Sequence, residues 1–524
     1  MKIVFVRPPF EGMGVYKPPH LGIAALSAFL KKKFGSKIKI EFIDALLYEM
    51  SEKDVVDKII ETNADVIGFT VKTMQVEQTL NIIKQIKKMS SPIIICGGNH
   101  VSVEPELFIE NGCDFAIVGE GETAIAYIIQ CLLNNIKISK SIISNLDIGK
   151  EQQDRMDKLV VVRDKEVDET LPDWEIMEIE KYNENIHYDK GIRALPIMAS
   201  RGCPYKCDFC SSFLTWGTKV RYRSPESVIN EIETEIEKYK IKNFHFYDDN
   251  LLLNRNWMSK FLPILLEKNL NINWICLSRP EIINRNSDLL PLMKKAGCIG
   301  FELGFETSDK ELYITMNKKN QGSEFYKTFN LILKYKFKMV EFLIMCFYEG
   351  ETLQTLCKTY NQLNYFYKNQ GFTKIIHSRY FATPFLKTEF NHNIDKKGII
   401  LSEGNRYKYA VFLNFVPYSF LNSNLKNLKI NNNVYSIWKE FFKFDNVINI
   451  EEFNYIRKKV EDSFDQLFNF VSDANGNVWN LCHEIQRKTK LHINKKAVVE
   501  YVCRMLELLA SKGVIGYKKE NLIL

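Results

Sequence analysis

Three closely spaced cysteines are the strongest chemical signal in this chain. Cys203, Cys207 and Cys210 have C-x3-C-x2-C spacing, and Phe209 directly precedes the last of them. Cysteine thiolates hold iron–sulfur clusters, and a four-iron cluster held by three thiolates keeps one iron open. An open metal position is typical of catalytic sites. Tetrahedral zinc would need a fourth ligand nearby, and no His lies between residues 191 and 240. The spacing therefore predicts a catalytic iron–sulfur site.

Length and composition set the broad class. A chain of 524 residues is expected to form several domains, and 46% hydrophobic with 26% charged residues is typical of a soluble globular protein. A net charge of +7 is modest for this length and does not indicate nucleic-acid binding. No apolar run is long enough to cross a bilayer, and the N-terminus does not resemble a signal peptide. The other cysteines are scattered singly, as buried free thiols in a reducing cytoplasm would be.

Residues 1–135 alternate short apolar runs with amphipathic segments, which predicts a doubly wound parallel sheet. The expected strands are Lys2–Val6, Ile38–Ile43, Val66–Thr70, Ile93–Cys96 and Phe115–Val118. The expected helices are Leu21–Phe34, Ser51–Thr62, Gln75–Met89, Glu104–Asn111 and Thr123–Leu133. Glycine pairs follow the last two strands, at Gly97-Gly98 and at Gly119-Glu120-Gly121. Because such sheets bind ligands beyond the carboxyl ends of their strands, these loops are candidates for a ligand site, although βα turns also use glycine structurally.

Residues 136–190 are polar and aperiodic and are expected to form a linker. The βα alternation resumes in residues 191–390, which predicts a partial barrel of six βα units. Its strands are expected at Leu195–Ser200, Asn243–Tyr247, Ile272–Leu277, Ile299–Leu303, Met339–Phe347 and Lys374–Phe381. Residues 391–524 show helical periodicity and predict a mostly α-helical C-terminal domain for substrate binding or closure.

The cysteine motif resembles the signature of the radical S-adenosylmethionine (SAM) enzymes. In that family the three cysteines hold a [4Fe–4S] cluster whose open iron binds SAM, and the reduced cluster cleaves SAM to a radical that abstracts hydrogen from the substrate. The resemblance therefore implies a [4Fe–4S] cluster on Cys203, Cys207 and Cys210, with Phe209 close to SAM.

The N-terminal segment resembles the cobalamin-binding domain that precedes the barrel in one large subclass. The resemblance implies cobalamin contacts from a set of residues in the loops after the third, fourth and fifth strands: Thr70, Lys72, Thr73, Gly97, Gly98, His100, Gly119, Glu120 and Gly121. The D-x-H-x-x-G motif, whose histidine ligates cobalt in other cobalamin proteins, is absent. Two candidates therefore remain for the position below cobalt: the loop after the third strand, and His100. A purely hydrogen-bonding role is the alternative for His100.

The barrel resemblance implies SAM contacts at the ends of the next strands. Asp248 or Asp249 is expected to bind the SAM ammonium, with helix capping as the structural alternative. Arg279 is expected either to hold the SAM carboxylate or to form a structural salt bridge. Gly304 and Glu306 match the glycine–glutamate segment, and Glu306 is preferred to Glu302 because it is expected beyond the strand end.

Together the two resemblances imply a cytoplasmic enzyme that transfers a methyl group from SAM, by way of methylcobalamin, to an unactivated carbon of a natural product or peptide. The implied partners are that substrate and an external electron donor such as flavodoxin or ferredoxin, with no nucleic acid and no membrane. A non-methylating radical cyclisation or rearrangement is the first alternative. A non-catalytic cofactor-binding sensor is the second.

Overall fold

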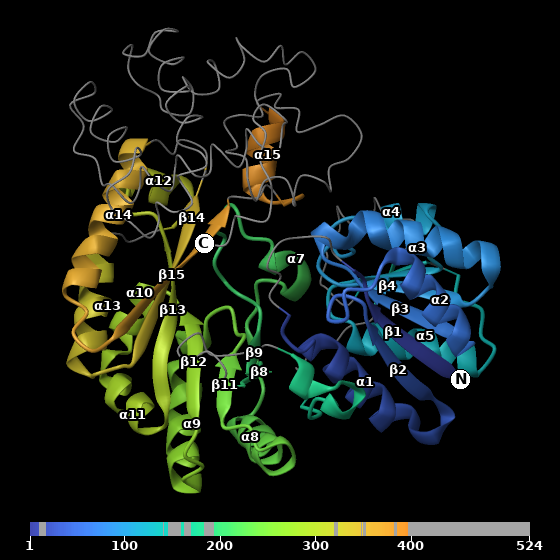
Figure 1. Cartoon of the computed structure of the whole chain (residues 1–524), viewed down its shortest axis with the longest axis horizontal. Helices are drawn as coiled ribbons and strands as arrows, with labels where there is room; N and C mark the ends of the chain where they lie inside the picture. Colours follow the sequence, from blue (N-terminus) through green and yellow to red (C-terminus); the bar gives the residue numbers. More distant parts are fainter. Residues whose placement is uncertain are drawn as a thin grey trace, which may run out of the picture. The chain divides into compact units, whose positions relative to one another are not determined.

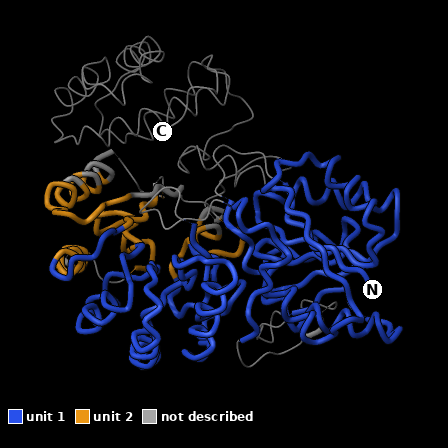
Figure 2. The backbone as a smooth tube through the Cα atoms, turned by 60° about the horizontal axis from the view of Figure 1, so that its bottom comes forward, with its two compact units in different colours: residues 1–206, 210–302, 334–340 blue, residues 207–209, 303–333, 341–524 orange. Residues whose placement is uncertain are grey.

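The computed structural model describes most of the chain up to residue 396. The described residues are 1–9, 17–139, 141–144, 159–161, 169–182, 193–318, 323–346, 348, 353–381 and 385–396. The C-terminal domain predicted for 391–524 therefore lies almost entirely outside them. The described chain divides into two units (Figure 2): one holds residues 1–206, 210–302 and 334–340, and the other holds 207–209, 303–333 and those from 341 onward. The division falls within two strands, Cys298–Glu306 and Met339–Cys346.

The N-terminal sheet is doubly wound, as the alternation predicted. Its strand order is β2-β1-β3-β4-β5-β6-β7, and neighbouring strands run parallel. The strands are β1 Lys2–Arg7, β2 Lys39–Asp44, β3 Val66–Thr70, β4 Ile93–Gly97, β5 Phe115–Val118, β6 Ile142–Ser144 and β7 Leu159–Val161. The helices are α1 Leu21–Phe34, α2 Glu52–Thr62, α3 Val76–Met89, α4 Pro105–Glu110 and α5 Glu122–Leu133 (Figure 1).

Two strands of this sheet were not predicted. β6 and β7 lie within residues 136–190, which the polar composition assigned to a linker. Each strand has three residues, too few to show a period of two against a polar background. The linker prediction is therefore wrong for residues 142–144 and 159–161.

Burial explains why the central strands stand out in the sequence. Ile3 and Val4 on β1, and Val66 and Ile67 on β3, are consecutive residues that are all fully buried. Consecutive residues of a strand point to opposite faces, so both faces of the sheet are covered. Each such side chain stabilises the fold by about 1.5–3 kcal/mol through burial. β1 lies between β2 and β3, so the direction in which successive strands are added to the sheet changes there, and such sheets bind ligands at this switch point.

A second sheet has the order β15-β14-β13-β12-β11-β8. Its strands are β8 Leu195–Ile197, β11 Asn243–Phe246, β12 Asn273–Ser278, β13 Cys298–Glu306, β14 Met339–Cys346 and β15 Lys374–Phe381. The helices are α7 Ser212–Trp216, α8 Pro225–Tyr239, α9 Arg255–Lys268, α10 Pro280–Arg285, α11 Leu290–Lys295, α12 Lys310–Thr315, α13 Ser323–Lys334, α14 Leu353–Lys368 and α15 Glu389–Lys396. β11 pairs in parallel with both β8 and β12. The six predicted strands are therefore present.

Two strand ends differ from the prediction by three residues. The expected strand Leu195–Ser200 ends at Ile197, and Ser200–Arg201 forms a separate strand, β9, antiparallel to β10 (Arg221–Tyr222). β13 extends to Glu306 instead of ending at Leu303. A side chain on Gly304 would lie 2.9 Å from Lys318 Nζ, so this glycine leaves space for the lysine beside a continuing strand.

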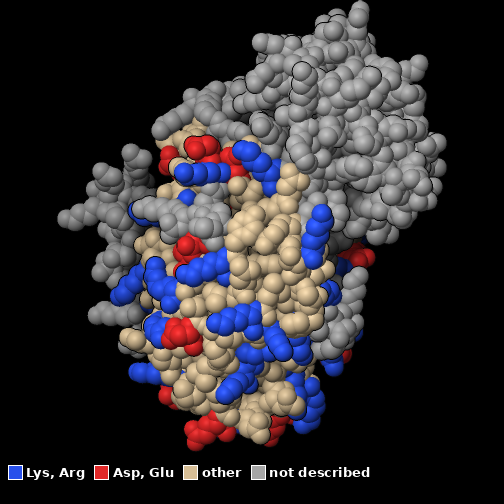
Figure 3. Space-filling model, turned by 90° about the vertical axis from the view of Figure 1, so that its left-hand side faces the viewer, with Lys and Arg blue, Asp and Glu red and all other residues tan. Residues whose placement is uncertain are grey.

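Charge is mixed on the face shown in Figure 3, where basic and acidic side chains are interspersed with uncharged surface. Within the described residues, no helix is both long and apolar enough to span a bilayer.

Candidate functional site

A cavity of about 300 Å³ lies at the carboxyl edge of the N-terminal sheet. It lies at the point where the strand order reverses, and residues of β1, β3, β4 and β5 line it. Most of the residues predicted for cobalamin line it: Thr70, Lys72, Gly97, Gly98, Gly119, Glu120 and Gly121. Within the described chain, the lining does not include Thr73 or His100.

Glycine is required at two places in these loops. Gly98 has φ +103°, and a side chain there would place Cβ 2.8 Å from the Val71 backbone nitrogen. Gly119 has φ +88°, and its N–H donates to Ser102 Oγ at 3.0 Å. L-amino acids rarely adopt such backbone angles. The loops are therefore fixed in a form that exposes backbone to the cavity, as a bulky ligand requires.

His100 has a structural role in this domain. Its Nδ1 lies 3.1 Å from Thr73 Oγ1, and its Nε2 lies 3.3 Å from Glu104 Oε2. The ring is 2% exposed. His100 and Thr73, the two predicted cobalamin residues that do not line the cavity, therefore contact each other. This agrees with the alternative expectation that His100 is a hydrogen-bonding histidine.

His20 lines the cavity and was missed as a candidate site residue. Its Nδ1 accepts the N–H of Ile23 at 3.2 Å and so caps α1. Burial, followed by the charges of Arg7 and Lys72, holds the pKa of His20 well below its ordinary value. A neutral imidazole that accepts at Nδ1 carries its proton on Nε2, which lies 3.4 Å from Thr70 Oγ1. His20 therefore presents an N–H donor, and this tautomer cannot ligate a metal through Nε2.

The cysteine motif occupies an irregular loop between β9 and α7. The side chains of Cys203, Cys207 and Cys210 are partly exposed. Among the described residues, no group of three or more His, Cys, Asp or Glu side chains is assembled closely enough to hold a metal ion. Two cysteines on barrel strands, Cys276 and Cys298, differ from these three in exposure. Both are fully buried, and burial raises the pKa of both thiols. Accessible thiols on one loop suit a cluster, whereas the buried thiols are poor ligands.

Two arginines next to this loop meet two glutamates of the cobalamin-type domain. Arg201 Nη1 lies 2.6 Å from Glu120 Oε2, and Arg201 Nη2 lies 2.6 Å from Glu122 Oε1. Arg221 pairs with the other oxygen of Glu120. Arg201, Glu120 and Glu122 also line the cavity. The ion pairs therefore connect the glycine loop after β5 to the residue that precedes Gly202 and Cys203.

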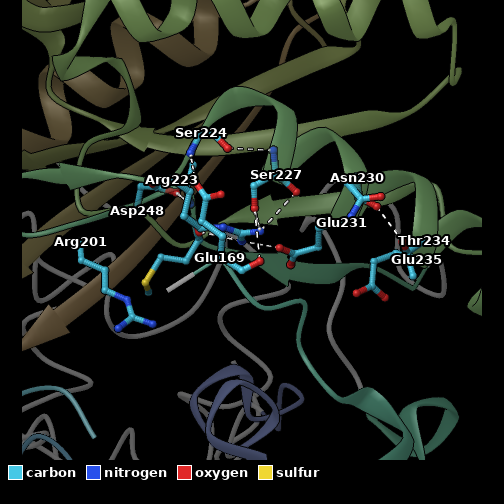
Figure 4. Close-up of polar contacts among 12 residues, drawn as sticks. Glu169, Arg201, Arg223, Ser224, Ser227, Asn230, Glu231, Thr234, Glu235 and Asp248 are labelled. Carbon is cyan, nitrogen blue, oxygen red and sulfur yellow. Dashed lines mark hydrogen bonds and ion pairs between the residues drawn. The ribbon is translucent and has the colours of Figure 1, made fainter. Parts of the chain in front are cut away.

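A buried ion pair anchors the end of the β9–β10 hairpin. Arg223 follows β10, and its Nη1 pairs with Glu231 of α8 while its Nη2 donates to Ser227 Oγ at 2.9 Å. Figure 4 shows this group, with the Arg201 side chain pointing away from it. Ser224 caps α8, since its Oγ accepts the N–H of Ser227 at 3.2 Å. The hairpin that carries Arg201 is therefore held from both ends.

The two aspartates after β11 have different surroundings. Asp248 is 1% exposed and accepts the N–H of Ala199 at 3.1 Å, together with the hydroxyl of Ser200. Burial raises the pKa of Asp248 to about 6, although these donors oppose the shift. Asp249 instead accepts from the Ser212 hydroxyl. Ser212 N–H in turn points to Cys210 Sγ at 3.5 Å, which connects Asp249 to the cysteine loop.

Arg279 lies against the cysteine loop. Its guanidinium carbon is 3.9 Å from the centre of the Tyr205 ring, and Tyr205 lies between Cys203 and Cys207. Its Nε pairs with Glu281. The structure thus shows the predicted salt bridge and also a cation–π contact to the loop that would hold the cluster.

In the second unit, Lys318 lies close to the remaining residues that were predicted to contact SAM. Its Nζ lies 2.6 Å from Glu306 Oε1, 3.2 Å from the Gly304 carbonyl oxygen and 5.8 Å from the centre of the Phe209 ring. Glu306 is the last residue of β13, so the expectation that it lies beyond the strand is wrong. Glu302 lies within the strand and pairs with His245 at 3.2 Å.

Comparisons with known proteins agree with this arrangement. Residues 15–129 match the B12 binding domain family, and residues 197–363 match the radical SAM superfamily. The anaerobic magnesium-protoporphyrin IX monomethyl ester cyclase of Rubrivivax gelatinosus is 30% identical over 383 residues, which cover 69% of this chain and 65% of the cyclase. An uncharacterized methyltransferase of Pyrococcus horikoshii is 29% identical over 322 residues, covering 60% of this chain and 67% of that protein. The chain thus spans slightly less than two thirds of the cyclase.

A solved structure supports the fold. OxsB, described as a cobalamin-dependent S-adenosylmethionine radical enzyme with aqua-cobalamin and SAM bound, superposes with a TM-score of 0.61 at 15% identity. The superposition covers 99% of this chain and 82% of OxsB. The chain therefore carries a B12-binding domain followed by a radical SAM domain. The two domain matches indicate a [4Fe–4S] cluster, SAM and cobalamin as the cofactors.

Proposed function

We propose that this enzyme transfers a methyl group from SAM, by way of cobalamin, to an unactivated carbon of a natural-product or peptide substrate. The supporting observation is that residues of both domains line the same cavity. Glu120 and Glu122 from the cobalamin-type domain pair with Arg201, which is separated from Cys203 by Gly202 alone. The expected cobalamin and cluster sites are therefore connected through a few residues, as a reaction that uses both cofactors requires.

The residues present fit both groups. Three partly exposed thiols suit a [4Fe–4S] cluster with an open iron, and we assign Cys203, Cys207 and Cys210 to it. The cavity offers glycine backbone together with Thr70 and Lys72, and we assign these residues to cobalamin. When bound, the cofactors supply the radical and methyl-transfer chemistry, which no protein side chain provides.

We assign the SAM contacts as follows. Asp249 is favoured over Asp248 because Ser212 links it to Cys210, whereas Asp248 is tied to the Ala199 N–H and the Ser200 hydroxyl. Arg279 is fixed against Tyr205 and is assigned to the SAM carboxylate. The group around Lys318, with Phe209, Gly304 and Glu306, is assigned to the remaining SAM contacts. A carboxylate and a guanidinium are the groups that recognise an amino acid's ammonium and carboxylate.

The methyl half of the reaction can be tested without knowing the substrate. The reconstituted protein, loaded with reduced cobalamin and given SAM, is expected to form S-adenosylhomocysteine in amounts that depend on cobalamin. A matched sample without cobalamin controls for uncatalysed transfer. Failure to form this product with cobalamin bound would contradict the methyltransferase proposal.

Radical cyclisation is the second candidate, favoured by one observation. The cyclase relative is 30% identical and the methyltransferase relative 29% identical, so similarity does not separate them. Cyclisation would form 5′-deoxyadenosine without S-adenosylhomocysteine, and its product would lack the added CH2.

Both candidates need electrons from outside the protein. We propose a one-electron donor such as flavodoxin or ferredoxin as the partner that reduces the cluster, and a cytoplasmic location, where such donors and reduced thiols coexist.

A further inference from the structure

Two arginines occupy directly opposite positions in the β9–β10 hairpin. Arg201 and Arg221 are cross-strand partners in the antiparallel pair. Like charges in directly opposed positions destabilise a strand pair. The side chains are 11% and 14% exposed, so water screens their repulsion poorly. The hairpin therefore needs negative charge supplied from elsewhere.

That charge comes from the loop after β5. The two carboxylate oxygens of Glu120 are divided between the arginines, and Glu122 takes the second terminal nitrogen of Arg201. Glu120 and Glu122 are 4% and 9% exposed. Burial would raise the pKa of Glu122, but the Arg201 guanidinium outweighs it and holds this pKa below its ordinary value. Two positive and two negative side chains thus form a buried group, here termed the four-charge bridge.

Each end of the bridge is continuous in sequence with a loop assigned to a cofactor. At one end, Gly119 and Gly121 flank Glu120, and both line the cavity. At the other end, Gly202 has φ +99°, and a Cβ there would lie 2.4 Å from the Lys219 carbonyl oxygen. Gly202 alone separates Arg201 from Cys203, so a displacement of Arg201 reaches the cysteine loop through a single residue.

We propose that the four-charge bridge is a positioning device that couples cobalamin binding to assembly of the cluster loop; this inference rests on the proposed use of both cofactors. A ligand in the cavity contacts Glu120 and Arg201 and excludes water from them, which strengthens their attraction. The strengthened bridge orders the cysteine loop. Coupling free energies are reciprocal. A bound cluster must therefore tighten cobalamin binding by the same factor by which bound cobalamin tightens cluster binding.

The reciprocity is tested first on the unaltered protein. Cobalamin affinity is measured by absorbance titration in the anaerobic protein with and without the reconstituted cluster. Typical coupling strengths predict a roughly 5- to 150-fold tighter dissociation constant when the cluster is present. Equal dissociation constants would overturn the proposal, whatever the enzyme's products are. A methylation failure would leave this ratio unchanged, so the two proposals fail separately.

Substitutions then locate the coupling. Arg201→Gln and Glu122→Gln each remove one charge from the bridge and are expected to bring the affinity ratio close to one. Arg255→Gln is the matched control, because Arg255 pairs with Asp288 at 2.5 Å on an exposed surface and is absent from the cavity lining. Its ratio is expected to equal that of the unaltered protein.

Folding is checked separately by circular dichroism, and iron content is measured per chain. If Arg201→Gln fails to fold, Glu122→Gln carries the test, because it is isosteric and leaves the Glu120 pairs in place. A folded Glu122→Gln or Arg201→Gln protein that keeps the full affinity ratio would overturn the assignment to the bridge.

Discussion

Lys318 Nζ lies 2.6 Å from Glu306 Oε1, and the two side chains are 5% and 9% exposed. Glu306 has φ +57°, an unusual angle for a residue with a side chain. Burial would lower the pKa of Lys318, but the Glu306 carboxylate outweighs it, and the pKa of Lys318 is raised. Lys318 therefore keeps its positive charge, and its ion pair with Glu306 fixes the end of β13.

Lys318→Met is expected to destabilise the protein by about 3–5 kcal/mol, because Glu306 would become an uncompensated buried charge. The midpoint of urea unfolding measures the effect. Lys358→Met is the control: Lys358 pairs with Asp309 at 2.7 Å but is 54% exposed, and a change within about 1 kcal/mol is expected. Equal effects of the two substitutions would contradict this interpretation.

Glu235 should make stability depend on pH. Burial and the neighbouring Glu231 carboxylate raise the pKa of Glu235 to about 8, although the Trp174 indole N–H donates to it at 2.6 Å. The folded state therefore holds the proton more tightly than the unfolded state. This stabilisation is complete below the unfolded pKa, near 4.5, and is lost as pH rises towards 8.

Glu235→Gln should remove this dependence, with an ideal slope of roughly 1.4 kcal/mol per pH unit within that window. Thermal unfolding at about pH 5.5 and about pH 8.5 measures it, and the variant should gain relative stability at the higher pH. Glu233→Gln on the same helix alters a partly exposed pair with Lys268 and should leave the dependence intact. A variant with the same pH dependence as the unaltered protein would show that Glu235 is not responsible.

Gly202→Ala should impair cluster binding. The new Cβ would overlap the Lys219 carbonyl oxygen, so the hairpin must separate at the start of the cysteine loop. We expect most of the bound iron to be lost after anaerobic reconstitution, as measured by iron analysis. Gly371→Ala also places alanine at positive φ, +57°, but nothing lies within 4 Å, and iron content should stay normal. Full iron occupancy in Gly202→Ala would refute the close-packing argument.

Tyr205 and Arg279 should act together in SAM binding. Tyr205→Leu removes the ring on which the guanidinium stacks, and Arg279→Gln removes the guanidinium itself. Both are expected to weaken SAM affinity about tenfold, the effect of losing roughly 1.4 kcal/mol. Tyr205→Phe keeps the ring and should bind SAM normally. Calorimetry on the reconstituted protein measures the affinities, and a weak Tyr205→Phe variant would indicate a role for the hydroxyl instead.

Much of the fold was readable because buried parallel strands are long apolar runs. β3 and β5 fall where the sequence predicted them, and α1 matches residue for residue. The three-residue strands β6 and β7 were not predicted, because two or three apolar residues in a polar segment are too few to show a period. β9 was merged with β8, since the bend between them leaves no compositional break.

Candidate site residues could be predicted only where residue type and position in the chain were enough to place them at the site. The glycine loops follow their strands in sequence, so their place at the cavity could be expected. His20 was missed because its cap to Ile23 and its contact with Thr70 require the folded sheet. The pairing of Arg201 with Glu120 joins residues far apart in the chain, and the only sequence signal was an arginine directly before the glycine and first cysteine of the motif.

The central claim is that one chain uses SAM in two ways, and a single anaerobic measurement addresses it. The protein is reconstituted with iron, sulfide and hydroxocobalamin, then given SAM and reductant, and mass spectrometry follows 5′-deoxyadenosine and S-adenosylhomocysteine. Cys210→Ala serves as the matched variant, because it removes one thiolate and leaves the cavity lining unchanged. We predict both products from the unaltered protein and no 5′-deoxyadenosine from Cys210→Ala. Absence of S-adenosylhomocysteine, from protein with both cofactors bound, would contradict the claim.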